Sequence, residues 1–164
     1  MITKAIRQYL EADATLMTDV KNVFTFYNAI NMRRVNNALS KNTFPMITVN
    51  ELTKTLNTVH QIGTEHNFNA QIEIQLDTIV EPDACNDKQI QNLNNLLDAH
   101  EANADRIFTL LHNYSGDMNG TSVVNILFEE SGDSQLVYNL YNNDKDQTVR
   151  RKTLNFNVNY KIGV

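Results

Sequence analysis

The chain has 164 residues, a formal net charge of −5 and a sequence pI near 5.3. This length suits a single domain, 1–164, that buries roughly 70% of the surface its unfolded chain would expose, and the acidic balance argues against general binding to duplex DNA. One cysteine excludes an internal disulfide, and no apolar run approaches the ~20 residues that cross a bilayer, so we expect synthesis in the cytosol and no membrane partner.

Asparagine is unusually frequent, with 24 residues scattered along the whole chain. Because these residues do not form a tract, compositional drift explains them better than a prion-like segment does. Only five glycines and two prolines occur, which leaves no candidate for a flexible linker between domains.

The first 30 residues predict two helical segments followed by a strand. Apolar side chains at helical spacing mark the first segment: Ile2, Ala5, Ile6, Tyr9 and Leu10. A break follows at 12–14, where Asp13 could cap the next segment, so two short helices or one kinked helix fit equally well. Residues 23–30 are aromatic, β-branched or apolar almost throughout, which predicts a strand buried on both faces.

The next stretch, residues 31–43, is polar and carries three cations, Arg33, Arg34 and Lys41, with no acidic side chain. Connections of this length in compact domains are often functional. Two interpretations stay open, a solvated surface loop and a basic arm that contacts a neighbouring subunit or nucleic acid.

Two further stretches predict a long antiparallel hairpin. The first strand runs from 46 to 62 with a bulge, the turn lies at 63–67, and the second strand covers 68–79. The second strand alternates strictly, which places its apolar residues on one face and leaves the other face to water. The apolar set is Phe68, Ala70, Ile72, Ile74 and Leu76.

The longest single periodicity runs from Asp87 to Tyr114 and predicts an α-helix of about 27 residues, capped by Asn86 or Asp87. The spacing fits a coiled coil between chains as well, but further apolar residues outside the seam favour packing on the chain's own sheet. The stripe consists of Ile90, Leu93, Leu97, His100, Ala104, Ile107, Leu111 and Tyr114.

Beyond a turn at 115–120, three extended runs at 121–130, 135–141 and 148–162 predict a C-terminal meander. Together these elements predict an α+β fold. We expect a mostly antiparallel sheet with one long helix and the N-terminal helix packed on it.

No side-chain pattern indicates catalysis, a cofactor or a metal. His100 and Glu101 resemble the start of a zinc-protease helix, but position 104 is alanine where a second histidine would be needed. Cys85 has acidic neighbours, which disfavour a reactive thiolate. The pair Glu129 and Glu130 is the one support for a hydrolase, and a solvated rim explains it better. We therefore expect no enzyme activity, no cofactor and no metal site.

A second basic cluster, formed by Arg150, Arg151 and Lys152, leads into the last strand, shortly after a loop that contains Asp144 and Asp146. One interpretation is a charged strand edge that discourages stray pairing. The other is an interface at which the basic cluster meets the acidic loop of an adjacent copy.

The order of these segments resembles the tail-terminator and tail-completion proteins of tailed bacteriophages, which are small α+β neck proteins at the head-tail connector. The matching features are Ile-x-x-Tyr-Leu at 6–10, Phe-Pro-Met-Ile-Thr-Val at 44–49, a mid-chain helix, and an arginine-rich entry into an alternating last strand at 150–160. The polar segment 31–43 and the length of the mid-chain helix depart from that pattern.

The resemblance implies a subunit of a homomeric ring, commonly a hexamer, in the neck of the virion. Such a ring stops polymerisation of the tail tube and joins the tail to the head connector, while DNA passes through its lumen without sequence-specific binding. Proteins of this kind are not enzymes and bind no cofactor.

Within this interpretation we expect charged residues to form subunit contacts or to line the lumen. The expected residues are Arg33, Arg34, Lys41, Asp144, Asp146, Arg150, Arg151 and Lys152. The alternative function is a small cytosolic binding module with a ligand groove between the long helix and the sheet.

Overall fold

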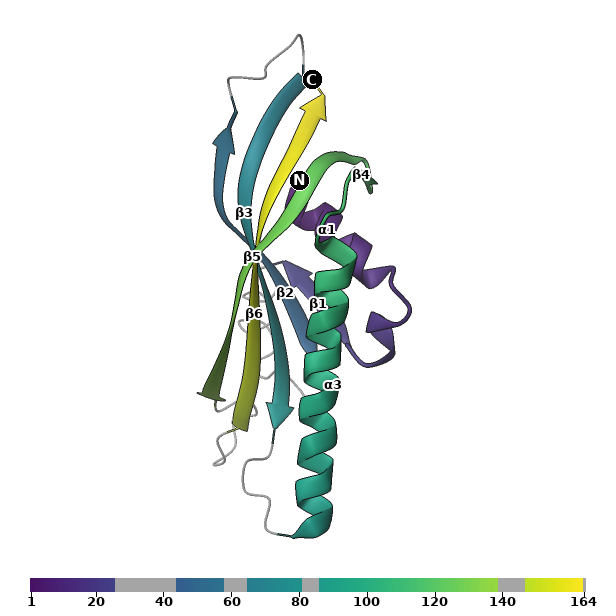
Figure 1. The fold of residues 1–164 in the computed structure, drawn as a ribbon, viewed down its shortest axis with the longest axis vertical. Helices are drawn as coiled ribbons and strands as arrows, with labels where there is room; N and C mark the ends of the chain where they lie inside the picture. Colours follow the sequence, from purple (N-terminus) through teal and green to yellow (C-terminus); the bar gives the residue numbers. More distant parts are fainter. Residues whose placement is uncertain (26–43, 58–64, 81–85, 139–146, 164) are drawn as a thin grey trace, which may run out of the picture.

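The computed structural model describes residues 1–25, 44–57, 65–80, 86–138 and 147–163 (Figure 1). Its helical elements are α1 (Ile2–Glu11), the short 3-10 helix η1 (Leu16–Thr18) and the long helix α3 (Asp87–Leu111). Its strands are β1 (Asn22–Thr25), β2 (Met46–Leu56), β3 (Glu65–Val80), β4 (Gly116–Met118), β5 (Thr121–Tyr138) and β6 (Gln147–Gly163).

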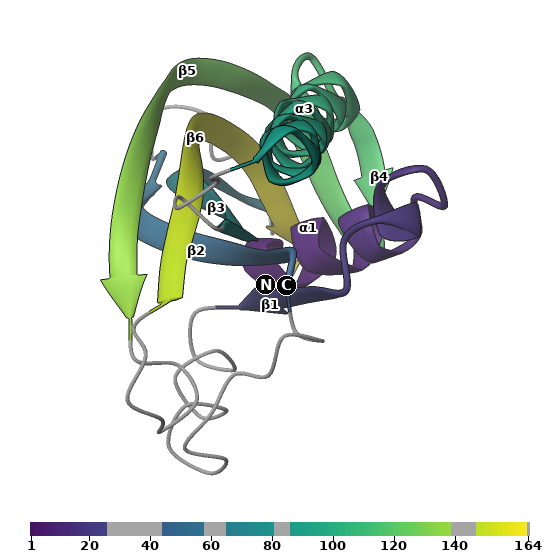
Figure 2. The ribbon, with the colours of Figure 1, turned by 90° about the horizontal axis from the view of Figure 1, so that it is seen from below.

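All six strands belong to one sheet in the order β1-β2-β3-β6-β5-β4. Every neighbouring pair is antiparallel except the first, since β1 runs parallel to β2. The long strands twist strongly, and seen along the long axis the sheet curls into half a barrel with α1 and α3 on the same side (Figure 2).

The predicted fold class is therefore wrong in its proportion of strand to helix and in its description of the sheet. Strand outweighs helix by a wide margin, and the sheet is mixed and curled. The physical reason is that alternation identifies a strand and its buried face but carries no information on the direction or identity of its partner. The predicted strand at 23–30 starts with β1, and its remainder lies outside the described residues, as does the polar segment 31–43.

The predicted hairpin is confirmed: β2 and β3 pair antiparallel, with a register shift between Glu51 and Thr53. β6 then pairs with the whole of β3, from Glu65↔Gly163 to Val80↔Thr148. The alternating apolar residues of β3 and β6 form the floor of the core, where the following are buried: Ala70, Ile72, Ile74, Leu76, Leu154, Phe156, Val158 and Tyr160.

The C-terminal meander differs from the prediction because residues 121–138 form one strand instead of two. Ser131, Gly132 and Asp133 suggested a turn, but each pairs directly with a residue of β6. A long, continuous partner strand supplies backbone hydrogen bonds that override the weak local preference of these residues for a turn. The predicted turn at 115–120 contains the short strand β4, which pairs with the start of β5.

The N-terminal segment separates into a helix and a single 3-10 turn, held by Asp13. The Asp13 carboxylate accepts a hydrogen bond from the backbone N–H of Leu16 at 2.7 Å, which confirms the predicted cap. The same carboxylate accepts two hydrogen bonds from Arg106 of α3, at 2.6 and 3.1 Å. Asp13 thus connects the first helical segment to the long helix.

Helix α3 begins at the predicted cap, where the side chain of Asn86 accepts a hydrogen bond from the N–H of Gln89. It ends at Leu111, three residues before the predicted end, since His112 is extended and Asn113 has a φ of 64°. The N–H of Asn113 then bonds to Ile126 of β5, so pairing with the sheet replaces the last helical turn.

The apolar stripe of α3 is buried over only half of its length. From His100 to Leu111 the helix contributes Ala104, Ile107 and Leu111 to the same core as α1 and the sheet. Toward its N-terminus the helix projects along the long axis of the molecule (Figure 1), and Ile90 is 46% exposed. The prediction of a stripe buried along the whole sheet is therefore wrong for the first three turns.

Candidate functional site

The charged residues that the structure brings together lie where α3 crosses β5 and β6. His100 and Glu101 come from α3, Asp133 from β5, and Arg150 and Lys152 from β6; we call these five residues the central charge cluster. Asp133 and Lys152 are direct cross-strand partners. Lys152 Nζ lies 3.0 Å from Glu101 Oε2 and 3.4 Å from Asp133 Oδ2, so it bridges the helix and the sheet.

Arg150 adds a second cation, with Nη2 3.6 Å from Asp133 Oδ1. Burial opposes the charge on Lys152, but the hydrogen bond that Lys152 donates to Glu101 and the charges of Asp133 and Glu101 outweigh it and raise the pKa of Lys152. The two carboxylates and two cations therefore compensate each other at neutral pH.

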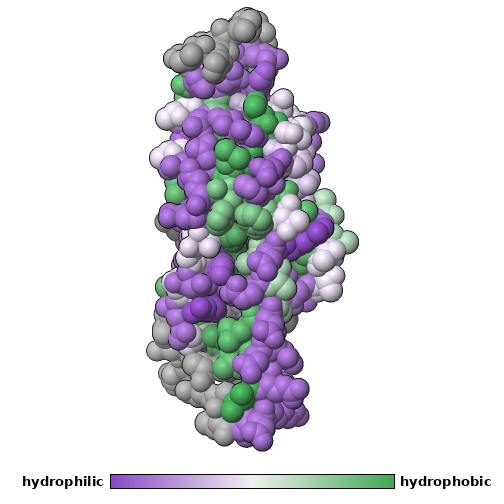
Figure 3. Space-filling view, in the orientation of Figure 1, coloured by the Kyte–Doolittle hydropathy of each residue, from purple (hydrophilic) through white to green (hydrophobic). Residues whose placement is uncertain are grey.

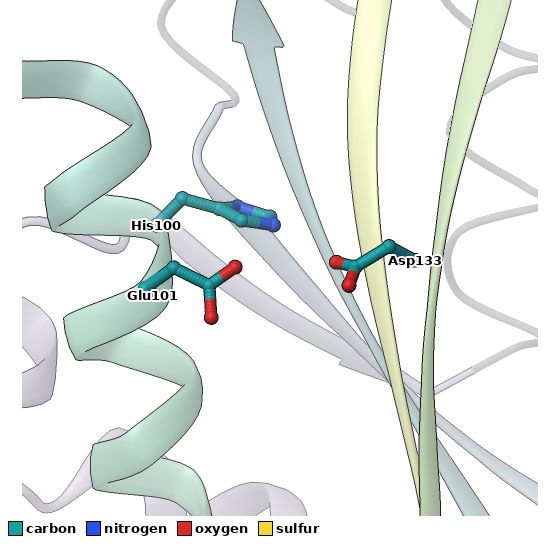
Figure 4. A group of neighbouring side chains, drawn as sticks. All are labelled: His100, Glu101 and Asp133. Atoms are coloured by element: carbon teal, nitrogen blue, oxygen red, sulfur yellow. The ribbon is translucent and has the colours of Figure 1, made fainter. Parts of the chain in front are cut away.

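His100 is the buried member of the cluster, with 1% of its surface exposed. Its Nδ1 lies 2.8 Å from Thr78 Oγ1 of β3, and its Nε2 has no hydrogen-bond partner among the described residues. Figure 4 shows the outer edge of the imidazole directed at Asp133, with the Glu101 carboxylate beside it. Burial lowers the pKa of His100 and favours the neutral ring.

Arg151 points to the opposite face of β6 from Arg150 and Lys152, because side chains alternate along a strand. There it forms a two-pronged ion pair with Asp77, its cross-strand partner on β3, at 2.7 and 2.8 Å. The Asp77 side chain is 2% exposed, so this carboxylate is held almost entirely out of water.

The other predicted contact residues, Arg33, Arg34, Lys41, Asp144 and Asp146, lie outside the described residues. The expected pairing of the basic cluster with the acidic loop of another copy therefore stays a prediction. Within the described ranges, the basic cluster has acidic partners in its own chain: Asp77, Glu101 and Asp133.

The role of Asp133 was not predicted, because Ser-Gly-Asp at 131–133 is a pattern typical of a turn. The register of β5 against β6 is the one signal that could have found it, and a single sequence does not reveal that register.

The face of the sheet that points away from the helices is lined mainly by amide and hydroxyl side chains. Cross-strand hydrogen bonds connect them, including Thr53 to Gln71 and Asn159 to Asn125. We call this surface the amide face, and its members are Thr53, Thr55, Asn69, Gln71, Asn125, Asn155, Asn157 and Asn159. Five of the 24 asparagines thus lie together on one face of the sheet.

Two strand edges are open in the part of the chain that the structure describes. β1 covers the outer side of β2 only as far as Val49, and β4 covers β5 only from Thr121 to Val123. No described strand pairs with the outer side of β2 beyond Val49 or with that of β5 beyond Phe128. Open edges of this kind can pair with strands of other chains.

Exposed hydrophobic residues occur on these elements and on the projecting part of α3. On β2, Leu52 and Leu56 are 54% and 45% exposed, and on α3 Ile90 and Leu96 are 46% and 40% exposed. Figure 3 shows hydrophobic surface in a broken band down one face of the molecule, between hydrophilic areas. Hydrophobic surface that is contiguous over a large area marks a surface that another protein can cover.

The alternative of a ligand groove between α3 and the sheet gains no support from the packing. His100, Ala104, Ile107 and Leu111 are buried, and the last three share one hydrophobic cluster with residues of β3, β5 and β6. Side chains of helix and sheet therefore occupy this interface. Over the ranges described, no helix is both long enough and apolar enough to cross a membrane.

Neither a protein-family model nor a curated protein matches the sequence. Among solved structures, the chain is similar to one from a structure described as "Virion of native gene transfer agent (GTA) particle", with a TM-score of 0.54 and 15% sequence identity. The match covers 98% of this chain and 95% of that chain. At this identity the likeness establishes a shared fold over nearly the whole chain.

Proposed function

We propose that this chain is a structural protein of a tailed phage or phage-like virion, located in the tail or neck. The observation that carries the proposal is the likeness, over almost the full length of both chains, to a component of a gene transfer agent virion. The match extends over whole chains and not over one motif, and it supports a related structural role as an analogy between folds.

Within the virion we propose the role of a tail-terminator or tail-completion subunit, in a homomeric ring that connects the tail tube to the head connector. A ring needs two different surfaces on each copy that complement each other head to tail. The open outer side of β2 and the open outer side of β5 lie on opposite margins of the sheet and offer such a pair. The role requires no catalysis, and we expect neither enzyme activity nor a cofactor.

The amide face suits a surface past which DNA moves. Its amide and hydroxyl side chains donate and accept hydrogen bonds, and Arg151 and Lys161, which lie on the same side of the sheet, are paired with Asp77 and Glu65, whereas a basic face would hold the duplex by releasing counterions. We therefore infer that the amide face is turned toward the lumen and the helices toward the outside of the ring.

Native mass spectrometry over a concentration series tests the ring. We expect a closed oligomer of about six copies, in line with the preference of homo-oligomers for closed symmetry. The double variant Leu52→Lys, Leu56→Lys should shift the population to monomers, because it places charge on an edge that the ring would cover. Ala102→Lys, an exposed change on α3, is the matched control and should assemble normally.

A chain that stays monomeric at every concentration and does not co-purify with any tail or neck component would contradict the ring. Co-purification with a tail tube by a monomeric chain would keep the virion role and would show that the ring forms only on the tail.

A further inference from the structure

We propose that His100, Glu101 and Asp133 form a binding site for a divalent transition-metal ion of the Zn²⁺ type, and that Lys152 occupies the position of this ion in its absence. The inference is independent of the proposed virion role, because it rests on the geometry of the central charge cluster alone. It also differs from the expectation of no metal site, which followed from the lack of a metal-binding motif in the sequence.

The three residues offer a mixed nitrogen and oxygen ligand set. One ligand atom from each lies within 4.8 Å of the others. Zinc holds such atoms at about 2.0 to 2.2 Å, which places neighbouring ligands about 3.4 Å apart in a tetrahedral site. The carboxylates can close this gap by turning once Lys152 moves away, since the Glu101 and Asp133 side chains are 52% and 37% exposed. A water molecule would complete the coordination.

His100 supplies the observation that distinguishes this site from an ordinary group of acidic residues. The ring is buried, and Nε2 has no hydrogen-bond partner among the described residues although it is directed at Asp133 (Figure 4). An unpaired buried nitrogen is unfavourable unless a ligand satisfies it. A metal ion bound to Nε2 would do so.

Thr78 provides the support that histidine ligands commonly have. Its hydroxyl lies 2.8 Å from Nδ1 and can accept the Nδ1 proton, which leaves the lone pair on Nε2 for a metal. A threonine hydroxyl can accept as well as donate, so this hydrogen bond is compatible with the tautomer that the site requires.

Lys152 explains how the two carboxylates are held together without a metal. Its ammonium group lies between Glu101 and Asp133, where a cation would bind. A divalent ion can replace this single charge if Lys152 turns outward, while Arg150 keeps its contact with Asp133. Lys152 is then a competitor of the metal, and its removal should strengthen metal binding.

Isothermal titration of Zn²⁺ into the full-length chain tests the site, with Co²⁺ absorption as a second readout of a histidine and carboxylate environment. We expect one ion per chain. Asp133→Asn and Glu101→Gln should each weaken binding at least tenfold, and Lys152→Met should strengthen it by a similar factor. Asp98→Asn, an exposed change on the same helix, is the matched control and should leave binding unchanged.

The variants separate a metal site from a purely structural cluster. If Lys152→Met binds no Zn²⁺, or if Asp133→Asn binds it as tightly as the unchanged chain, the proposal is overturned. Both carboxylate variants alter exposed side chains, so their folding can be verified by circular dichroism before titration.

Discussion

Arg151 and Asp77 form the most buried ion pair in the described part of the chain, and they lie at the centre of the sheet between β6 and β3. A carboxylate that is 2% exposed depends on its partner, because an unpaired buried charge is strongly unfavourable. This residue of the basic cluster thus has a structural role within its own chain.

Replacing Arg151 should destabilise the fold far more than replacing its neighbour. Arg151→Met is expected to cost about 3 kcal/mol of unfolding free energy, since it leaves Asp77 buried without its cation. Arg150→Met removes a longer and more exposed contact and should cost about 0.5 kcal/mol. Urea unfolding of both variants measures the difference, and equal losses would contradict the structural role of Arg151.

The ion pair between Asp13 and Arg106 should make the stability of the fold depend on pH in the acid range. The hydrogen bonds from Arg106 lower the pKa of Asp13 below its ordinary value of 3.8, and the backbone hydrogen bond from Leu16 and the charge of Arg106 act in the same direction, although burial opposes them. A carboxylate with a lowered pKa stabilises the fold above its ordinary pKa, and this contribution is lost as the pH falls through the lowered value.

Asp13→Asn keeps an acceptor for the cap but loses the ionic partner of Arg106. We expect the variant to be less stable than the unchanged chain at pH 7 and the gap to close as the pH falls below about 4. Urea unfolding from pH 7 to pH 3 provides the test. Asp98→Asn is the control and should show no gap at pH 7, and a gap for Asp13→Asn that does not narrow between pH 5 and pH 3 would contradict the explanation.

At the scale of elements, the two halves of α3 have different environments. Its C-terminal half is amphipathic and fixed in the core, while its N-terminal half has the same apolar periodicity but extends beyond the sheet (Figure 1). A single helix cannot shield its own apolar stripe from water. The projecting half is therefore suited to contact with another subunit.

Two alanine variants distinguish the halves. Ile107→Ala should cost about 3 kcal/mol in unfolding free energy, because Ile107 is fully buried and its loss leaves a cavity. Ile90→Ala should cost less than about 1 kcal/mol in the isolated chain but should weaken assembly, which sedimentation velocity can measure. A large stability loss for Ile90→Ala would show that the first turns are packed within the monomer.

At the scale of the whole molecule, the sheet separates two surfaces of different character. The helices and the main hydrophobic core lie on one side, and the amide face lies on the other, next to a smaller buried cluster of Phe44, Met46 and Val149. An acidic protein whose accessible sheet face has no cluster of cations should not bind duplex DNA strongly.

We expect no measurable binding to duplex DNA at physiological salt for the unchanged chain. The triple variant Asn155→Lys, Asn157→Lys, Asn159→Lys should bind without sequence preference, and its log affinity should fall with log salt concentration with a slope of about −3. Fluorescence anisotropy with a labelled duplex measures both. Strong binding by the unchanged chain would contradict a lumen that lets DNA slide.

Several features of the structure could be predicted from local side-chain chemistry, without knowing which elements pack against each other. The caps at Asp13 and Asn86, the hairpin of β2 and β3, and the buried faces of β3 and β6 follow from side-chain type and spacing, and the structure confirms them. These features depend on residues that are close in the sequence, so their pattern is visible in one chain.

The tertiary structure alone decided the parallel pairing of β1, the continuity of β5 and the point at which α3 leaves the sheet. The same holds for the central charge cluster, whose members come from residues 100 to 152 and meet only through the register of β5 and β6 under the helix. Spacing along a chain defines which way a side chain points. Only packing between distant elements determines what that side chain meets, because each contact depends on the position of all the others.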